Sequence, residues 1–363
     1  MVSSKLPFAL LLCSLFFFLL PHVSNAHLLK LCEFEAIYNL GDSISDTGNL
    51  IQEDLLLCLV DFHMVKTCIG MQRVDVQMAS KSAGIPLLNA YLNANSTKTH
   101  GVNFAVAGST ALPVEFLAEN GVIAPVTNSS LTIQLKWMGR HFNTTCHNSK
   151  DCIEKHRKSL FMVGEIGGND YNYAFFQGKT IDELTNIVQN VVKTIKEVVM
   201  RVIGFGATRI VVPGNFPIGC MPIYLTGFHT NDSTAYDEFH CLKELNNFSM
   251  YHNLHLQQAI KELQEKYPHV TIVYGDYYNA FKWVLQKAAI LGFDTQSLQK
   301  ACCGSGGDYN FSLAKLCGTP NVPVCPKPLE RMSWDGIHST QKAYFFMAQW
   351  LIRDIFQKLR CIA

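Results

Sequence analysis

The sequence has little charge, and almost no excess of one sign. Its 363 residues are 16% charged and 48% hydrophobic, with a formal net charge of +1. The near-zero net charge gives no electrostatic reason to expect nucleic acid or an anionic membrane surface as a partner. The low charge and high apolar content exclude a disordered chain and predict a well-filled core. We therefore expect no nucleic-acid partner.

The sequence also lacks, near its N-terminus, an apolar run long enough to cross a bilayer, which takes about 20 residues. The stretch at residues 6–20 is shorter than this. It follows one positive charge, Lys5, and precedes Ser24-Asn25-Ala26, the small-residue pattern of a cleavage site. These features predict a signal peptide over residues 1–26 and no stable membrane insertion. We expect a secreted protein, either extracellular or in the vacuole or apoplast.

No Cys-x-x-Cys pair occurs among the 13 cysteines, which argues against a cysteine-ligated metal. The adjacent Cys302 and Cys303 cannot easily ligate one zinc ion in tetrahedral geometry. Cys13 falls within the expected signal peptide, and the even number that remains is compatible with disulfides in an oxidising compartment. We expect neither a metal nor a cofactor.

Six Asn-x-Ser/Thr sequons fit the same compartment and predict N-glycans. They begin at Asn95, Asn128, Asn143, Asn231, Asn247 and Asn310.

Short apolar runs alternate with amphipathic segments along the rest of the chain. We expect strands at residues 26–40, 102–106, 159–163, 209–213 and 270–274. Helices are expected at residues 182–204, 236–266 and 340–359. The alternation predicts an α/β fold with a parallel sheet covered on both faces. No repeat, low-complexity tract or long linker interrupts it, so we expect residues 27–363 to form a single domain.

Three of these strands end in residues suited to a catalytic crevice. Residues 41–49, with the sequence GDSISDTGN, follow the first strand, and Gly108 and Asn169 follow the next two. The carboxyl ends of parallel strands meet at one edge, so these residues can line one crevice. Taken alone, the Asp-Ser pair is more typical of a helix N-cap, and only the remote blocks described below favour a nucleophile.

Ahead of the last expected helix, Asp335 and His338 are separated by three positions on a tight turn. The aspartate can there orient the imidazole, leaving its other nitrogen free to activate a serine hydroxyl. The alternative for this stretch alone is an Asx-type turn that caps the helix.

Taken together, these blocks resemble the GDSL esterase/lipase family, also called SGNH hydrolases. The matching blocks are GDS at residues 41–43, NFAVAGS at 103–109, GGND at 167–170 and DGIH at 335–338. Further stretches at residues 164–173, 212–220 and 301–304 look like the plant branch of the family. The resemblance covers residues 34–49 and about 83 to the C-terminus. It implies a flavodoxin-like three-layer α/β/α fold and hydrolysis of carboxylic esters.

The resemblance also implies a role for each matching residue. Ser43 is the nucleophile, His338 the general base and then acid, and Asp335 the residue that orients the histidine. The backbone N–H groups of Ser43 and Gly108 and the side-chain amide of Asn169 form the oxyanion hole. The implied substrates are small-molecule esters, either acylated metabolites such as alkaloid acetates and choline esters or acyl lipids, and we expect a monomer.

Two alternatives stay open beside this interpretation. An acyltransferase could use the same triad, and nothing in the sequence separates it from a hydrolase. A non-catalytic secreted glycoprotein could keep the fold, although the intact set of five site residues argues against it.

Residues 55–78 depart from the family pattern, which has a Pro-Tyr-Gly segment and a Thr-Gly-Arg-x-Ser-x-Gly segment in this region. Degenerate codons for residues 63–78, read one nucleotide earlier, can encode PYGQNLYRNATGRCSNG. We therefore hypothesise that the stretch is out of frame, through a genomic insertion or deletion or a faulty gene model. The helix expected before Gly84 would then be largely missing, and Cys58 and Cys68 become suspect. Sequencing the transcript across codons 50–85 tests this, and an uninterrupted frame would contradict it.

Overall fold

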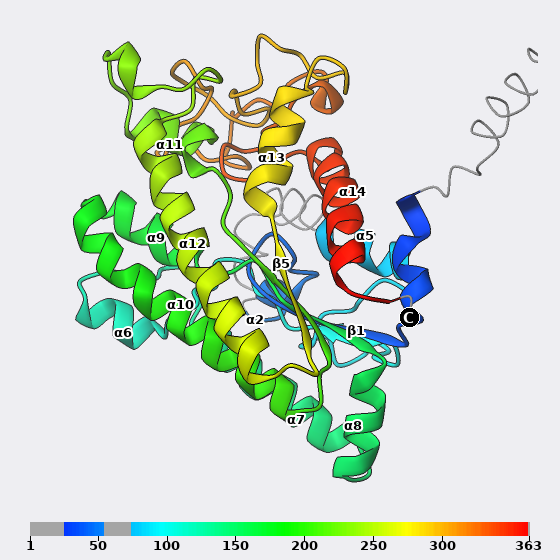
Figure 1. Ribbon diagram of the computed structural model, residues 1–363. Coiled ribbons are helices and arrows are strands. Elements are labelled where there is room, and N and C mark those ends of the chain that lie inside the picture. Colours follow the sequence, from blue (N-terminus) through cyan, green and yellow to red (C-terminus); the bar gives the residue numbers. More distant parts are fainter. Residues whose placement is uncertain (1–24, 54–73, 362–363) are drawn as a thin grey trace, which may run out of the picture.

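The centre of the structure, a computed structural model that describes residues 25–53 and 74–361, is an all-parallel β-sheet (Figure 1). Its strand order is β2-β1-β3-β4-β5. The strands are β1 (Ala36–Leu40), β2 (Gly101–Asn103), β3 (Ser159–Val163), β4 (Arg209–Pro213) and β5 (Thr271–Gly275). Tyr38 of β1 pairs with Val102 on one side and with Phe161 on the other. β1 and β3 are buried along their whole length, which explains why they are continuous apolar runs.

Helices cover both faces of this sheet (Figure 1). Tyr38 and Phe161 point into a core shared with α7 (Leu131–Thr145), α10 (Ile181–Gly204) and α12 (Lys243–Lys266). Their neighbours Ile37 and Leu160 point into the opposite core, with η1 (Asn25–Cys32), α5 (Val74–Ala83), α13 (Tyr277–Gln286) and α14 (Gln341–Lys358). The expected three-layer α/β/α fold is therefore confirmed.

The remaining helices connect these layers. They are α2 (Asn49–Glu53), α6 (Val114–Glu119), α8 (Ser149–Arg157), α9 (Gly168–Phe176), α11 (Pro222–Gly227), η2 (Ile218–Cys220), η3 (Ser233–Ala235) and η4 (Pro328–Glu330).

Helix α10 shows how the sequence specifies one of these layers. Thr180 and Glu183 form a capping box, in which each side chain accepts a hydrogen bond from the other's backbone N–H. Nine aliphatic side chains at three- and four-residue steps bury one face of the helix. Gly206, with φ +102°, follows its end, where a left-handed residue commonly stops a helix. The expected helix at residues 182–204 is confirmed.

Three expected elements were too long. The strand expected at residues 102–106 is observed as β2 and ends at Asn103, because the Asn49 side chain, and not a neighbouring strand, donates to the carbonyls of Asn103 and Ala105. The first strand, expected at residues 26–40, is only β1, because the chain before it forms η1. The helix expected at residues 236–266 begins at Lys243. Before that point Asp237 accepts hydrogen bonds from the backbone N–H groups of Phe239 and Cys241, and a disulfide joins Cys241 to Cys220. These contacts hold residues 236–242 in a turn.

The segment with the hypothesised frame error lies mostly outside the described residues, as do Cys58 and Cys68. Its last residues belong to α5, a ten-residue helix that packs against η1 and α14. The expectation that a helix before Gly84 is largely missing is therefore wrong for residues 74–83.

Five disulfides link described cysteines. They join Cys32 to Cys361, Cys146 to Cys152, Cys220 to Cys241, Cys302 to Cys325 and Cys303 to Cys317. The first pair ties η1 to the end of the chain after α14, and the last two lie in the irregular segment between α13 and α14. The preference for disulfides over cysteine–metal sites is confirmed for these pairs.

Within the described ranges, we find no helix both long and apolar enough to cross a membrane.

Candidate active site

The predicted nucleophile, Ser43, lies just beyond the end of β1. The chain turns sharply at Gly41, where φ is +150° and a Cβ atom would come within 2.9 Å of the Ser45 Oγ. The side chain of Asp42 accepts the backbone N–H of Ile44 at 3.0 Å, which fixes the turn. Ser43 itself is half-buried between buried neighbours. Its hydroxyl is thus held at the sheet edge within reach of a ligand.

The predicted base reaches this hydroxyl from the segment before α14. His338 Nε2 lies 2.8 Å from Ser43 Oγ, and His338 Nδ1 lies 2.7 Å from Asp335 Oδ2. The other carboxylate oxygen of Asp335 accepts the backbone N–H groups of Ile337 and His338 at 2.9 and 2.7 Å. Three residues separated by almost 300 positions therefore form one hydrogen-bonded chain.

The electrostatics of this chain favour a charged histidine–aspartate pair. Burial disfavours the charged form of Asp335, but the charge of His338 and hydrogen bonds to the carboxylate outweigh it and lower the Asp335 pKa. Burial likewise acts to lower the pKa of His338. The charge of Asp335 and its hydrogen bond outweigh this and raise the His338 pKa above its usual value. The pair can therefore take up a proton from Ser43 and stabilise the resulting imidazolium.

The predicted oxyanion donors Gly108 and Asn169 lie on the segments that follow β2 and β3, and both segments are hydrogen-bonded to the nucleophile loop. Gly108 has φ +80°, and a Cβ atom there would lie 2.4 Å from Val126, so only glycine fits. The side-chain amide of Asn169 donates to the Ser109 carbonyl at 3.0 Å and, at the longer distance of 3.3 Å, to Asp42 Oδ2. Within the described ranges, the backbone N–H groups of Ser43 and Gly108 donate to no protein acceptor. These two donors are free to bind an oxygen.

A pair of buried carboxyl groups, Asp42 and Glu165, lies next to the nucleophile. Both belong to blocks singled out in the sequence, but their pairing was not predicted. Asp42 is hydrogen-bonded to the side chain of Glu165, and its backbone N–H donates to the Glu165 carbonyl at 3.1 Å. Burial raises the pKa of Asp42 to about 6, against the lowering effect of the hydrogen bonds that its carboxyl group makes with the Ile44 N–H and the Glu165 side chain. Because Asp42 also contacts the Asn169 amide, the pair connects the nucleophile loop to the oxyanion loop.

Further buried polar side chains fix the backbone of the site. Gln134 of α7 accepts the Gly41 N–H at 2.9 Å and donates to the Gly41 carbonyl at 2.8 Å and to Ser109 Oγ at 3.1 Å. Asp46 accepts four backbone N–H groups, those of Gly48, Asn49, Leu50 and Ala107. Nothing in the sequence around Gln134 marks it, whereas Asp46 belongs to the GDSISDTGN block itself.

A small hollow adjoins the predicted base. The hollow that His338 shares with Met221, Phe281 and Met332 encloses about 10 Å³, at the lower limit for one water molecule. A much larger groove of about 580 Å³ lies elsewhere, between α12, α13 and α14, and no triad residue lines it.

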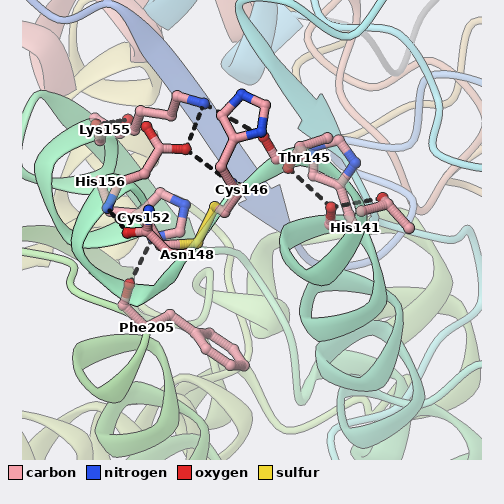
Figure 2. Close-up of a disulfide and its surroundings, with 12 residues drawn as sticks. His141, Thr145, Cys146, Asn148, Cys152, Lys155, His156 and Phe205 are labelled. Carbon is pink, nitrogen blue, oxygen red and sulfur yellow. Dashed lines mark hydrogen bonds and ion pairs between the residues drawn. A yellow bond between two sulfur atoms is a disulfide. The ribbon is translucent and has the colours of Figure 1, made fainter.

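One cluster of cysteine and histidine residues has the composition of a metal site, but its members are already bonded to other groups of the protein. Cys146, Cys152 and His156 place their ligand atoms within 4.8 Å of one another. The two cysteines form a disulfide between α7 and α8, and His156 Nδ1 is hydrogen-bonded to the carbonyl oxygen of Phe205 (Figure 2). A disulfide offers no thiolate, so this cluster does not suit a metal ion.

The predicted glycosylation sites differ in exposure. Asn95, Asn128, Asn143, Asn231 and Asn247 are exposed. Asn310 is half-buried, and its amide nitrogen, the atom a glycan would modify, donates to the Ala301 carbonyl at 2.7 Å. Asn310 is thus the least suited of the six to carry a glycan.

Comparison with known proteins agrees with this architecture. Residues 37–351 match the family model for GDSL-like lipases and acylhydrolases. A GDSL esterase/lipase of Arabidopsis thaliana is 45% identical over 340 residues, which cover 93% of this chain and 94% of that protein. Acetylajmalan esterase 2 of Rauvolfia serpentina is 41% identical over 344 residues, covering 92% and 93%. Acetylajmalan esterase 1 of the same plant is 39% identical over 341 residues, covering 91% and 89%. The chain therefore belongs to the GDSL lipase/acylhydrolase family and is a carboxylic ester hydrolase.

Proposed function

We propose that the protein is a secreted serine esterase that hydrolyses small acylated metabolites through Ser43, His338 and Asp335. The observation that carries the proposal is the pair of hydrogen bonds from Ser43 Oγ to His338 Nε2 and from His338 Nδ1 to Asp335. A serine hydroxyl is a weak nucleophile until an adjacent base removes its proton, and this arrangement supplies that base.

The reaction then proceeds in two balanced halves. Ser43 Oγ attacks the ester carbonyl carbon while its proton passes to His338 Nε2. The carbonyl oxygen becomes an oxyanion that accepts hydrogen bonds from the N–H groups of Ser43 and Gly108 and from the Asn169 amide. The ester C–O bond breaks, and His338 returns the proton to the leaving alcohol. Water repeats the sequence on the acyl-serine, releases the carboxylic acid and restores Ser43.

The Asn169 amide must leave a neighbour to serve as an oxyanion donor. Its bond to Ser109 is short, whereas its contact with Asp42 is at 3.3 Å and is the weaker of the two. We infer that the hydrogen directed at Asp42 is the one that turns to the oxyanion. Asp42 then acts as a positioning residue that holds the amide ready.

Small acylated metabolites are favoured over long-chain lipids by the comparison with known proteins. Two relatives that match over most of this chain are named as acetylajmalan esterases. Short acyl groups such as acetate need no deep apolar pocket.

The test is ester turnover by the purified protein against p-nitrophenyl acetate, butyrate, octanoate and palmitate. We expect activity on acetate and butyrate and at least tenfold lower kcat/KM on palmitate. Ser43→Ala should abolish turnover, and Ser305→Ala, a half-buried serine outside the described triad, should retain it. Equal turnover of palmitate would contradict the substrate class, and activity in Ser43→Ala would contradict the nucleophile.

Acyl transfer is the second candidate function, and adding an alcohol acceptor distinguishes it from hydrolysis. In the presence of an alcohol acceptor such as glycerol, a hydrolase releases mainly free acid. Product analysis showing mainly the new ester would favour a transferase.

Secretion has its own test. Expressed in plant cells, the protein should appear in the medium or vacuole with His27 as its N-terminal residue. An intact Met1 in the recovered protein would contradict the signal peptide.

A further inference from the structure

A groove lined by none of the proposed triad residues lies between α12, α13 and α14. It encloses about 580 Å³, and the three helices are labelled in Figure 1. This volume is in the range of about 300–1,000 Å³ that is typical of ligand sites. Nothing in the ester hydrolysis described above uses it.

The side chains that line the groove combine aromatic faces with planar polar groups. Trp283 of α13 and Trp350 of α14 are both half-buried and contribute to its wall. Around them lie carboxylate, amide and ammonium groups, from Asp237, Asn279, Gln286, Lys243 and Lys282. An indole ring offers a flat apolar face at small entropic cost, and the polar groups can bond hydroxyls and acetamides. This combination matches the two kinds of surface on an N-acetylhexosamine.

A second hollow of about 360 Å³ adjoins the first. It shares Trp283 and Trp350 and continues past Arg353 and Asp354 of α14. The two tryptophans therefore separate two open spaces along one surface, which gives room for more than one sugar unit.

The sequon residue Asn247 lines this same groove. It is exposed, and it lies on the face of α12 that also presents Lys243 and Met250, four residues before it and three after. A glycan attached to its side-chain nitrogen would thus start at the groove wall. Other exposed sequon residues, such as Asn231 near η3, do not line the groove.

We propose that the groove binds the protein's own N-glycan. The first sugars linked to Asn247 pack against Trp283 and Trp350. The proposal rests on the proposed secretion, because only the secretory pathway attaches this glycan. The occupant is a glycan of N-acetylhexosamine core, held in place by its covalent link, so weak contacts suffice to order it.

The experiment measures how fast a peptide N-glycosidase removes each glycan from the folded, secreted protein. Site-resolved mass spectrometry compares Asn247 with Asn231, its exposed control. A glycan that is bound in the groove about nine-tenths of the time is accessible to the glycosidase for only about one-tenth of the time. We therefore expect removal at Asn247 to be about tenfold slower than at Asn231. In Trp283→Ala this difference should disappear, whereas Trp137→Ala, on α7 outside the groove, should keep it.

Slow removal could also come from the helix that carries Asn247, and the tryptophan variants decide this. Protection that persists in both Trp283→Ala and Trp350→Leu overturns the proposal. Retained ester turnover shows that each variant is folded, since neither residue belongs to the proposed triad. Equal rates at Asn247 and Asn231 in the wild type also overturn it.

Mass spectrometry also shows which sequons carry a glycan, and this result distinguishes failure of the groove proposal from failure of the secretion proposal. If Asn231 carries a glycan and Asn247 does not, secretion stands and the groove proposal fails. If no sequon carries a glycan, the groove proposal fails, and the N-terminal residue of the recovered protein decides whether secretion stands.

Discussion

The two halves of the proposed catalytic chain are held by different forces. Ser43 sits where a buried parallel strand ends, in a loop fixed by neutral and acidic polar side chains such as Gln134 and Asp46. His338 and Asp335 follow residues 287–334, the segment between α13 and Asp335, which has little regular structure and in which two disulfides provide cross-links. The serine half therefore depends on satisfied buried hydrogen bonds, and the histidine half depends on covalent restraint.

The histidine half is tied to its disulfides through the backbone. Cys302 and Cys303 donate their N–H groups to the carbonyls of Ser333 and Trp334 at 3.1 and 2.6 Å. Gly336, with φ +95°, lies so close to Phe311 that a Cβ atom would approach it to 2.2 Å. Each half can thus be weakened separately.

Among the changes that leave the triad intact, the largest effect is expected on the serine side, from Asn169→Ala. Loss of one oxyanion donor typically lowers kcat by about 10²–10³-fold. KM should change little, because the ground-state carbonyl carries less charge than the transition state. Steady-state kinetics on p-nitrophenyl acetate measure both. A loss below threefold would exclude Asn169 from the oxyanion hole.

On the histidine side, we expect Cys303→Ala/Cys317→Ala to lower the free energy of unfolding by about 3 kcal/mol, from the size of the loop it closes. The matched control is Cys146→Ala/Cys152→Ala, which removes a shorter loop away from the triad and should cost about 2 kcal/mol. Urea unfolding measures both. Only the first variant should also lose ester turnover, so equal activity losses would contradict the division into halves.

A smaller loss of stability is expected from Gln134→Ala. This change leaves the buried N–H of Gly41 without its partner and removes one of the two hydrogen bonds to the Gly41 carbonyl, which the Val106 N–H still contacts, so it should cost about 2 kcal/mol. Gln258→Ala, at an exposed position on α12, should stay within about 0.5 kcal/mol of the wild type. Urea unfolding compares the two variants. A Gln134→Ala protein as stable as this control would show that the serine loop does not need these bonds.

The smallest effect concerns pH. His338 must be neutral to accept the Ser43 proton, and its pKa is raised, so kcat/KM should rise with pH and level off only above the usual histidine range. At one pH unit below the midpoint, kcat/KM should be about tenfold lower than its plateau value. Asp42, with its pKa near 6, is the competing group, and Asp42→Asn separates them. The acid limb should persist in this variant, and its disappearance would assign the limb to Asp42 instead.

Much of this architecture follows from sequence pattern. β3 and β4 and the long helix α10 are predictable, because buried strands and one-faced helices carry their periodicity with them. The turn before α12 is not, since it depends on the Cys220–Cys241 bond between segments 21 residues apart. The same holds for Gln134 and Glu165, whose partners come from other elements. A short motif indicates which residues take part in the reaction, but it does not show which contacts hold those residues in position.

The central claim is that Ser43, activated by His338, is the nucleophile. A fluorophosphonate probe, followed by mass spectrometry of the digested protein, tests it most directly. We expect one adduct, on the peptide that contains Ser43, which is absent from Ser43→Ala and slowed by a factor on the order of 10⁴ in His338→Gln. An adduct on another serine, or undiminished labelling of either variant, would contradict the account.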